Sequence, residues 1–96
     1  MFIGKEVIIR CKDAGVFFGT LVSKNNDEVT LKNARKLFYW EGAAAVEQIA
    51  VDGVKFPDSC KFTIWVESIE LFGVCQIIAC TKTASEKIKD VKEWKM

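Results

Sequence analysis

Short runs in which hydrophobic and polar residues alternate dominate the chain. In residues 5–11, for example, Val7, Ile9 and Cys11 fall on one side, which is the two-residue period of a half-buried strand. The same period predicts further strands over residues 16–24, 28–40, 62–67, 68–74 and 75–80. Asn and Asp at residues 25–27 predict a hairpin turn, and Gly73 predicts a turn or kink between the last two strands.

A helical period interrupts the strands once. Val46, Ile49, Ala50 and Gly53 follow the i, i+3, i+4, i+7 spacing, which predicts a helix over residues 43–52 that ends at Gly53. The three alanines at 43–45 would give the start of this helix a surface of small side chains. A flat ligand or a partner backbone could approach closely there, although good helix propensity alone would also explain the alanines.

The C-terminal segment predicts a second helix, over residues 84–93. Thr83 and Glu86 have the spacing of a capping box at its start, and Ile88, Val91 and Trp94 would form its buried side. The predicted fold is therefore α+β and mainly β. We expect one domain, residues 1–96, with a small SH3-like or Sm-like barrel of five to six strands, an inserted short helix and the C-terminal helix. Open sheet edges predict a homo-oligomer, a dimer or a tetramer.

The third strand breaks its own pattern. Asn33 and Arg35 fall on the side where core residues are expected, so either the strand bulges near Ala34 or these polar groups point into a pocket. Gly19, in the middle of the second strand, predicts a bulge or the close approach of another group.

The composition excludes several kinds of chemistry. The formal net charge is +1, too small for a protein that grips long nucleic acid. The chain has no histidine, and no two of its four cysteines have the C-x-x-C spacing, so we expect no enzyme, no metal site and no cofactor. The cysteines are expected to be reduced, with Cys11, Cys75 and Cys80 as small apolar fillers. A disulfide or a metal site is the alternative.

No apolar run reaches membrane-spanning length, and the N-terminus lacks the layout of a signal peptide. We therefore expect a soluble protein of the cell interior that has no contact with membranes.

Basic and aromatic residues gather in residues 33–40. Cationic groups can hold phosphates, and aromatic rings can stack on bases, so this block predicts a site for a small nucleotide. Residues of types that suit a nucleotide lie in two neighbouring predicted strands and at the start of the first predicted helix: Arg35, Lys36, Tyr39, Trp40, Asn33, Thr20 and Ala43. In the competing interpretation the aromatic rings belong to the core and the charges to its rim.

Four blocks of the chain resemble a widespread family of short phage-encoded proteins: AGVFFGTL (residues 14–21), NARKLFYWEGAA (33–44), QIAVDGV (48–54) and KIKDVKEW (87–94). The chain is similar, in particular, to the phage anti-CBASS sponges. That resemblance implies binding of cyclic di- or trinucleotides, such as 3′,3′-cGAMP, without cleavage. It also implies homo-oligomers, with a tetramer as one form, in the cytoplasm of the infected bacterial host.

Carried over to the matching positions, the resemblance implies that Arg35 holds phosphate, that Tyr39 and Trp40 stack on bases, and that Thr20 and Asn33 read base edges. Two other functions are open. One is a protein-interaction module that inhibits a host protein or acts in phage assembly, which the apolar residues and open edges favour. The other is an Sm-like RNA binder, which the low charge disfavours.

Overall fold

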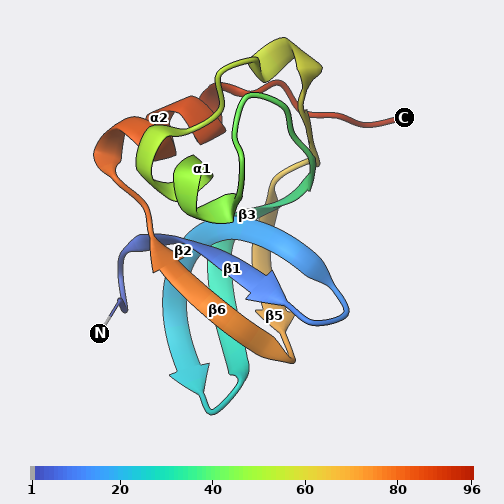
Figure 1. Cartoon of the computed structure of the whole chain (residues 1–96). Helices are drawn as coiled ribbons and strands as arrows, with labels where there is room; N and C mark the ends of the chain where they lie inside the picture. Colours follow the sequence, from blue (N-terminus) through green and yellow to red (C-terminus); the bar gives the residue numbers. More distant parts are fainter. Residues whose placement is uncertain (1) are drawn as a thin grey trace.

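Six strands pair in one antiparallel sheet, and two helices lie together at one end of it (Figure 1). The computed structural model describes residues 2–96. The elements are β1 (Glu6–Cys11), β2 (Gly15–Asn25), β3 (Glu28–Tyr39), α1 (Val46–Asp52), the 3-10 turn η1 (Pro57–Ser59), β4 (Lys61–Phe62), β5 (Val66–Leu71), β6 (Val74–Ala79) and α2 (Lys82–Asp90). The predicted α+β, mainly β architecture is confirmed.

The sheet order is β4-β3-β2-β1-β6, and β5 also pairs with β3. The long strand β3 is shared between two neighbours, because residues 29–34 face β5 whereas Leu37 and Tyr39 face β4. The sheet is open: within residues 2–96, β5 and β6 form no ladder with each other although they follow one another in the chain.

The hydrophobic core has two parts. One lies between the sheet and the helices and joins strand residues such as Ile8 and Phe18 to Ile49 of α1 and Ile88 of α2. The other is built from strand residues alone, with Leu31 at 0% exposure. Strands β1 and β2 contribute to both parts, because Ile8 and Phe18 belong to the first whereas their neighbours Val7, Ile9 and Phe17 belong to the second. Burying one such aliphatic side chain contributes about 1.5–3 kcal/mol.

The irregularity in β3 is a bulge, as one of the two sequence interpretations expected. Phe18 pairs with Arg35 and Thr20 pairs with Lys32, so the pairing advances two residues on β2 but three on β3. Asn33 takes up the extra residue with a φ of 49°. The expectation for Gly19 is confirmed too, since a Cβ there would come within 3.0 Å of the Ala34 Cβ.

The first helix ends as predicted and begins later. Gly53 closes it with a φ of 77° and donates its N–H to Ile49 O at 2.9 Å. The predicted start at residue 43 is wrong: Ala45 is the extended N-cap, and Ala44 N–H donates instead to the Gln48 side chain at 2.7 Å. Alanine propensity therefore did not decide the boundary.

Two strand boundaries also differ from the prediction. The expected strand over residues 62–67 is broken at residues 63–65, where Thr63 accepts hydrogen bonds from Lys36 and Arg35, and β5 then runs from Val66 to Leu71. Turn residues 72–73 join β5 to β6, so the turn expected at Gly73 is confirmed.

The predicted capping box of the second helix is also corrected. Thr81, not Thr83, is the N-cap, because its hydroxyl accepts from Ala84 N at 3.0 Å. The same hydroxyl donates to Val51 O at 2.7 Å, which joins the start of α2 to the end of α1. Ile88 and Val91 are buried as predicted, whereas Trp94 is 41% exposed.

Candidate functional site

The side chain of Arg35 lies inside the protein, only 1% exposed. Its Nε donates to Thr63 O at 3.1 Å and its Nη2 to Phe62 O at 3.2 Å. Its Nη1 donates to Ile88 O at 3.0 Å and to Val91 O at 2.9 Å. These bonds engage four of the five guanidinium N–H groups. The expectation that Arg35 holds a phosphate is therefore corrected, because the side chain is buried and its N–H groups bind backbone carbonyls inside the protein.

Among residues 2–96 no carboxylate forms a direct ion pair with Arg35, so its buried charge is compensated in other ways. Two of its acceptors, Ile88 and Val91, lie at the end of α2, where the helix dipole is negative. The Trp65 ring lies 4.7 Å from the guanidinium carbon and adds a cation–π contact. Burial lowers the pKa of Arg35, and the nearby Glu93 carboxylate opposes that change. Arg35 thus ties β3, β4 and α2 together.

Two other predicted residues come together in a groove. Thr20 and Asn33 line a hollow of about 400 Å³ with Trp65, and the Glu6–Lys89 ion pair forms another part of its wall. Trp40 and Ala43 do not reach this groove. Both are half-buried and pack against the core below the helices, and Trp40 lines a separate hollow of about 260 Å³ with Arg10 and Glu47.

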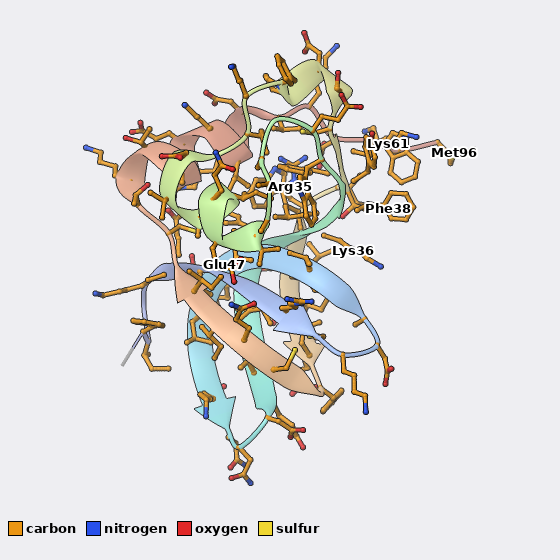
Figure 2. The ribbon with its side chains drawn as sticks, viewed as in Figure 1. Arg35, Lys36, Phe38, Glu47, Lys61 and Met96 are labelled. Atoms are coloured by element: carbon orange, nitrogen blue, oxygen red, sulfur yellow. The ribbon has the colours of Figure 1, made fainter. Side chains whose placement is uncertain are left out.

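The remaining predicted residues, Lys36 and Tyr39, belong to a larger exposed group, which we call the basic-aromatic surface. Figure 2 shows Lys36, Phe38 and Lys61 on one side of the molecule beside the C-terminal residue. Phe38 is 54% exposed, so its ring is open to solvent. The surface consists of Lys36, Phe38, Tyr39, Lys61 and Trp94.

The rings and cations of this surface contact one another closely. Phe38 and Trp94 stack with their centroids 4.9 Å apart and their planes at 16°. Lys61 Nζ lies 5.5 Å from the Trp94 centroid and 5.9 Å from that of Tyr39, and Lys36 Nζ lies 5.9 Å from that of Phe38. The arrangement presents flat apolar faces between two ammonium groups, the combination that a ring carrying a negative group requires.

The fold assembles this surface from three segments. Lys61 lies opposite Tyr39 in the β3–β4 pairing. Trp94 arrives from beyond α2, where its N–H donates to Phe62 O at 2.8 Å. Sequence reasoning placed Phe38 in the right block but missed Lys61 and Trp94. A β3–β4 register would have indicated Lys61, whereas no local pattern places Trp94 beside Phe38.

An acidic residue, Glu41, borders the surface at Tyr39. The Tyr39 hydroxyl donates to Glu41 Oε2 at 2.6 Å. This hydrogen bond, followed by the charge of Glu41, raises the pKa of Tyr39, so the phenol stays neutral above its ordinary range. Glu41 also places one negative charge at the Tyr39 end of the surface, which weakens the attraction of this end for an anion.

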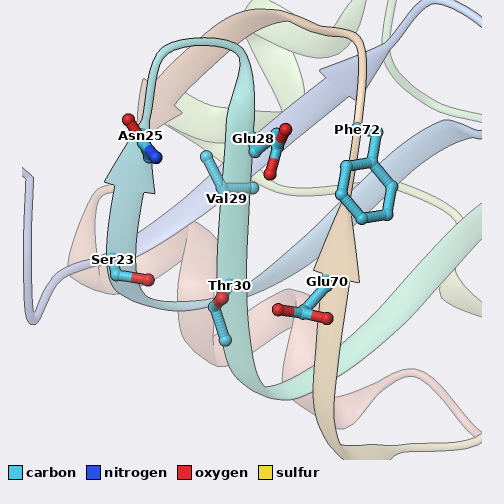
Figure 3. A pocket seen from close by; sticks show the side chains of 7 residues that line it. All are labelled: Ser23, Asn25, Glu28, Val29, Thr30, Glu70 and Phe72. Atoms are coloured by element: carbon cyan, nitrogen blue, oxygen red, sulfur yellow. The ribbon is translucent and has the colours of Figure 1, made fainter.

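A hollow at the far end of the β2–β3 hairpin has the opposite character (Figure 3). It measures about 200 Å³, and Glu28 and Glu70 point into it beside the exposed ring of Phe72. Two carboxylates repel a phosphate, so this hollow does not suit a nucleotide.

The four cysteines are free thiols. The expectation that Cys75 fills the core is corrected, because its side chain is exposed and its Sγ–H donates to Arg10 O at 3.3 Å. Among residues 2–96, no three His, Cys, Asp or Glu side chains gather in a way that would hold a metal ion. No helix in that range is long and apolar enough to cross a membrane.

Comparison with known proteins adds a family but no activity. A family model described as a domain of unknown function (DUF6948) matches residues 4–88. No curated protein and no solved structure matches the chain.

Proposed function

The chain belongs to the DUF6948 family, whose description names neither a ligand nor a reaction. We propose that it is a non-catalytic nucleotide-binding protein. Its ligands are cyclic di- or trinucleotides, such as 3′,3′-cGAMP, which it sequesters intact as a phage counter-defence protein in the cytoplasm of the infected bacterium. The SH3-like or Sm-like barrel is part of the proposal. Its support is that the two outermost strands of the order β5-β3-β2-β1-β6 are joined by a two-residue turn. The proposed barrel keeps an open seam between these two strands, so the edge of β6 stays free.

The observation that carries the proposal is the stack of Phe38 on Trp94 between Lys36 and Lys61. Exposed aromatic faces stack on nucleobases, and each such contact contributes about 1–3 kcal/mol. Lysine ammonium groups on flexible stems neutralise phosphates without demanding one geometry. In this proposal the main binding residues are Lys36, Phe38, Tyr39, Lys61 and Trp94. Thr20 and Asn33 add polar groups from the groove that they line.

Thermal unfolding with added ligand tests the proposal. A ligand that binds only the folded protein stabilises it by about 2.7 kcal/mol at a hundred times its Kd, which raises the Tm by several degrees. We expect 3′,3′-cGAMP or a cyclic trinucleotide to raise the Tm of the natural protein. Phe38→Ala and Lys61→Glu should abolish most of that rise. The matched controls are Phe72→Ala and Lys82→Glu, which change exposed residues outside the basic-aromatic surface.

The fate of the ligand is the second measurement. After incubation and heat denaturation, mass spectrometry should recover the cyclic nucleotide unchanged. A cleaved product would contradict sequestration, and the absence of any Tm rise with all cyclic nucleotides would contradict nucleotide binding itself.

A protein-interaction module remains the second candidate, as an inhibitor of a host protein or a phage assembly part. Its support is the exposed apolar pair Val51 and Phe56, at 56% and 51% exposure. The test is whether a host protein co-purifies with the chain. Loss of that protein from the Val51→Glu or Ala44→Trp variant, but not from Lys61→Glu, would favour this candidate over nucleotide capture.

A further inference from the structure

The strand β6 has one unpaired side. It forms an end of the sheet, and β1 is its partner. Cys80 N–H donates to Glu6 O at 2.9 Å, which continues the β1–β6 register. Because N–H groups alternate between the two sides of an antiparallel strand, those of Ile77 and Ala79 point away from β1. Neither has a backbone acceptor within residues 2–96.

The free edge of β6 lacks the features that keep edge strands apart. Its sequence, VCQIIA, contains no charged residue and no proline. Free edges of natural proteins usually carry such guards, because an open row of N–H and C=O groups pairs with another strand. The edge strand β5 differs, since Glu67 and Glu70 are exposed on it. Two copies of β5 placed side by side would bring like charges together, which is unfavourable.

An apolar groove lies next to the free edge. It measures about 280 Å³ and is lined by Phe2, Leu21, Ile77 and the stem of Lys24. Ile3, beside it in the chain, is 48% exposed. A strand added to β6 would bring its own side chains over this groove. The apolar surface covered would contribute about 25 cal/mol for each Å² removed from water.

We propose that this edge is the interface for a second copy of the chain, with β6 pairing antiparallel to β6 of its partner about a two-fold axis. The absence of charge on β6 makes the strand compatible with itself, whereas β5 is not. A two-fold contact uses the same surface on both copies and stops at two, so the product is a closed dimer. Ile77 and Ala79 donate their free N–H groups across the axis, and the apolar groove of each copy is covered by the other.

A proline at position 79 tests this interface without disturbing the sheet of the monomer. Ala79→Pro removes an N–H that the β1–β6 ladder does not use, a position where edge strands accept proline. Ile78→Pro is the matched control, because its N–H is directed to β1 and its loss damages the sheet itself. A second variant, Phe2→Ser, removes part of the groove without touching the ladder, and Phe56→Ser is its control at an exposed site elsewhere.

Sedimentation equilibrium over a concentration series measures the outcome. The natural protein and Phe56→Ser should reach twice the monomer mass of 10.8 kDa. Ala79→Pro should remain a monomer with an unchanged circular dichroism spectrum, and Phe2→Ser should require higher concentrations to dimerise. A protein that stays monomeric throughout would overturn the proposal. So would a dimer that survives both variants, or a larger ring or filament, which would indicate β5-to-β6 contacts.

Amide hydrogen exchange of the natural protein decides the matter if Ala79→Pro does not fold. The amides of Ile77 and Ala79 should exchange more slowly as the protein concentration rises, while that of Ile78 is protected at every concentration. Equal exchange of the Ile77 and Ala79 amides in dilute and concentrated samples would overturn the interface.

Discussion

The Nη1 atom of Arg35 and the carbonyl oxygen of Val91 lie 2.9 Å apart, so a side chain from the middle of β3 closes the end of α2. The last carbonyls of a helix lack most of their partners within it. Those of Ile88 and Val91 accept from the same guanidinium group, and Ile88 O also accepts from Val91 N–H at 3.4 Å. The charge that stood out in the sequence as a ligand group thus joins the C-terminal helix to the sheet.

Replacing Arg35 should therefore destabilise the protein. Arg35→Met removes a donor from four carbonyls. Phe62 O and Ile88 O keep backbone donors, Trp94 N–H and Val91 N–H, whereas Thr63 O and Val91 O are stranded. Each stranded group costs about 1–3 kcal/mol, not additively. We expect a total loss of about 3–5 kcal/mol from the two stranded carbonyls and the weakened bonding of the other two. At about 4–8 °C per kcal/mol, the Tm should fall by more than 10 °C, measured by circular dichroism.

Arg35→Lys and Lys36→Met sharpen this prediction. A lysine keeps the charge but lacks the planar fork, so Arg35→Lys should lose about 2 kcal/mol or more. Lys36→Met, at the half-exposed neighbour, should stay within about 0.5 kcal/mol of the natural protein. An Arg35→Lys protein with unchanged Tm but lost nucleotide binding would show that Arg35 serves a ligand after all.

The helix caps offer a second test, on two threonines two residues apart. Thr81→Ala removes the N-cap, worth about 0.5–2 kcal/mol, and also the bond to Val51 O. We expect urea unfolding to show a loss of about 1–3 kcal/mol. Thr83→Ala should change stability by less than about 0.5 kcal/mol, because alanine is the better helix former and Thr83 caps nothing. A larger loss for Thr83→Ala would restore the predicted capping box.

The contrast between these residues shows what the sequence can and cannot predict. Hydrophobic alternation located β1, β2 and β3 within a residue or two, because the period of a half-buried strand is local. The role of Arg35 depends on carbonyls from residues 62, 63, 88 and 91, which no local pattern brings together. The basic-aromatic surface likewise needs Trp94 to return beside Phe38. Local periods predicted the strands, and long-range contacts decided the site.

The bulge at Asn33 makes a third prediction. Its φ of 49° is in the left-handed region, which costs most residues with a Cβ about 1–2 kcal/mol and branched ones more. Asn33→Gly should keep or slightly raise stability, whereas Asn33→Val should lose about 1–2 kcal/mol in urea unfolding. Lys32→Val, at the preceding exposed position, is the control and should stay near neutral. Equal effects at 32 and 33 would contradict a bulge centred on Asn33.

The four thiols should differ in reactivity. Burial raises the pKa of Cys11 and Cys60, and it raises that of Cys80 to about 12, so these groups stay protonated at mildly alkaline pH. Thiolates, not thiols, react with iodoacetamide. Peptide mass spectrometry of briefly treated folded protein should find Cys75, the exposed thiol, labelled first. In urea all four should react alike, and early labelling of Cys80 in the folded protein would contradict its burial.

The last prediction concerns Tyr39 and Glu41. The chain contains a single tyrosine, so the phenolate signal in a titration comes from Tyr39 alone. Glu41 accepts a hydrogen bond from the neutral phenol and repels the phenolate, and both effects raise the pKa of Tyr39. Glu41→Gln removes the negative charge, so the pKa should fall towards its ordinary value. Alkaline titration of the phenolate absorbance, with circular dichroism to confirm the fold, measures the difference. The same change removes the carboxylate that is hydrogen-bonded to Tyr39 of the basic-aromatic surface, so Glu41→Gln should bind cyclic nucleotides more tightly at low salt. A lower pKa with unchanged affinity would place the ligand away from Tyr39. An unchanged pKa would mean that the hydrogen bond does not persist in solution.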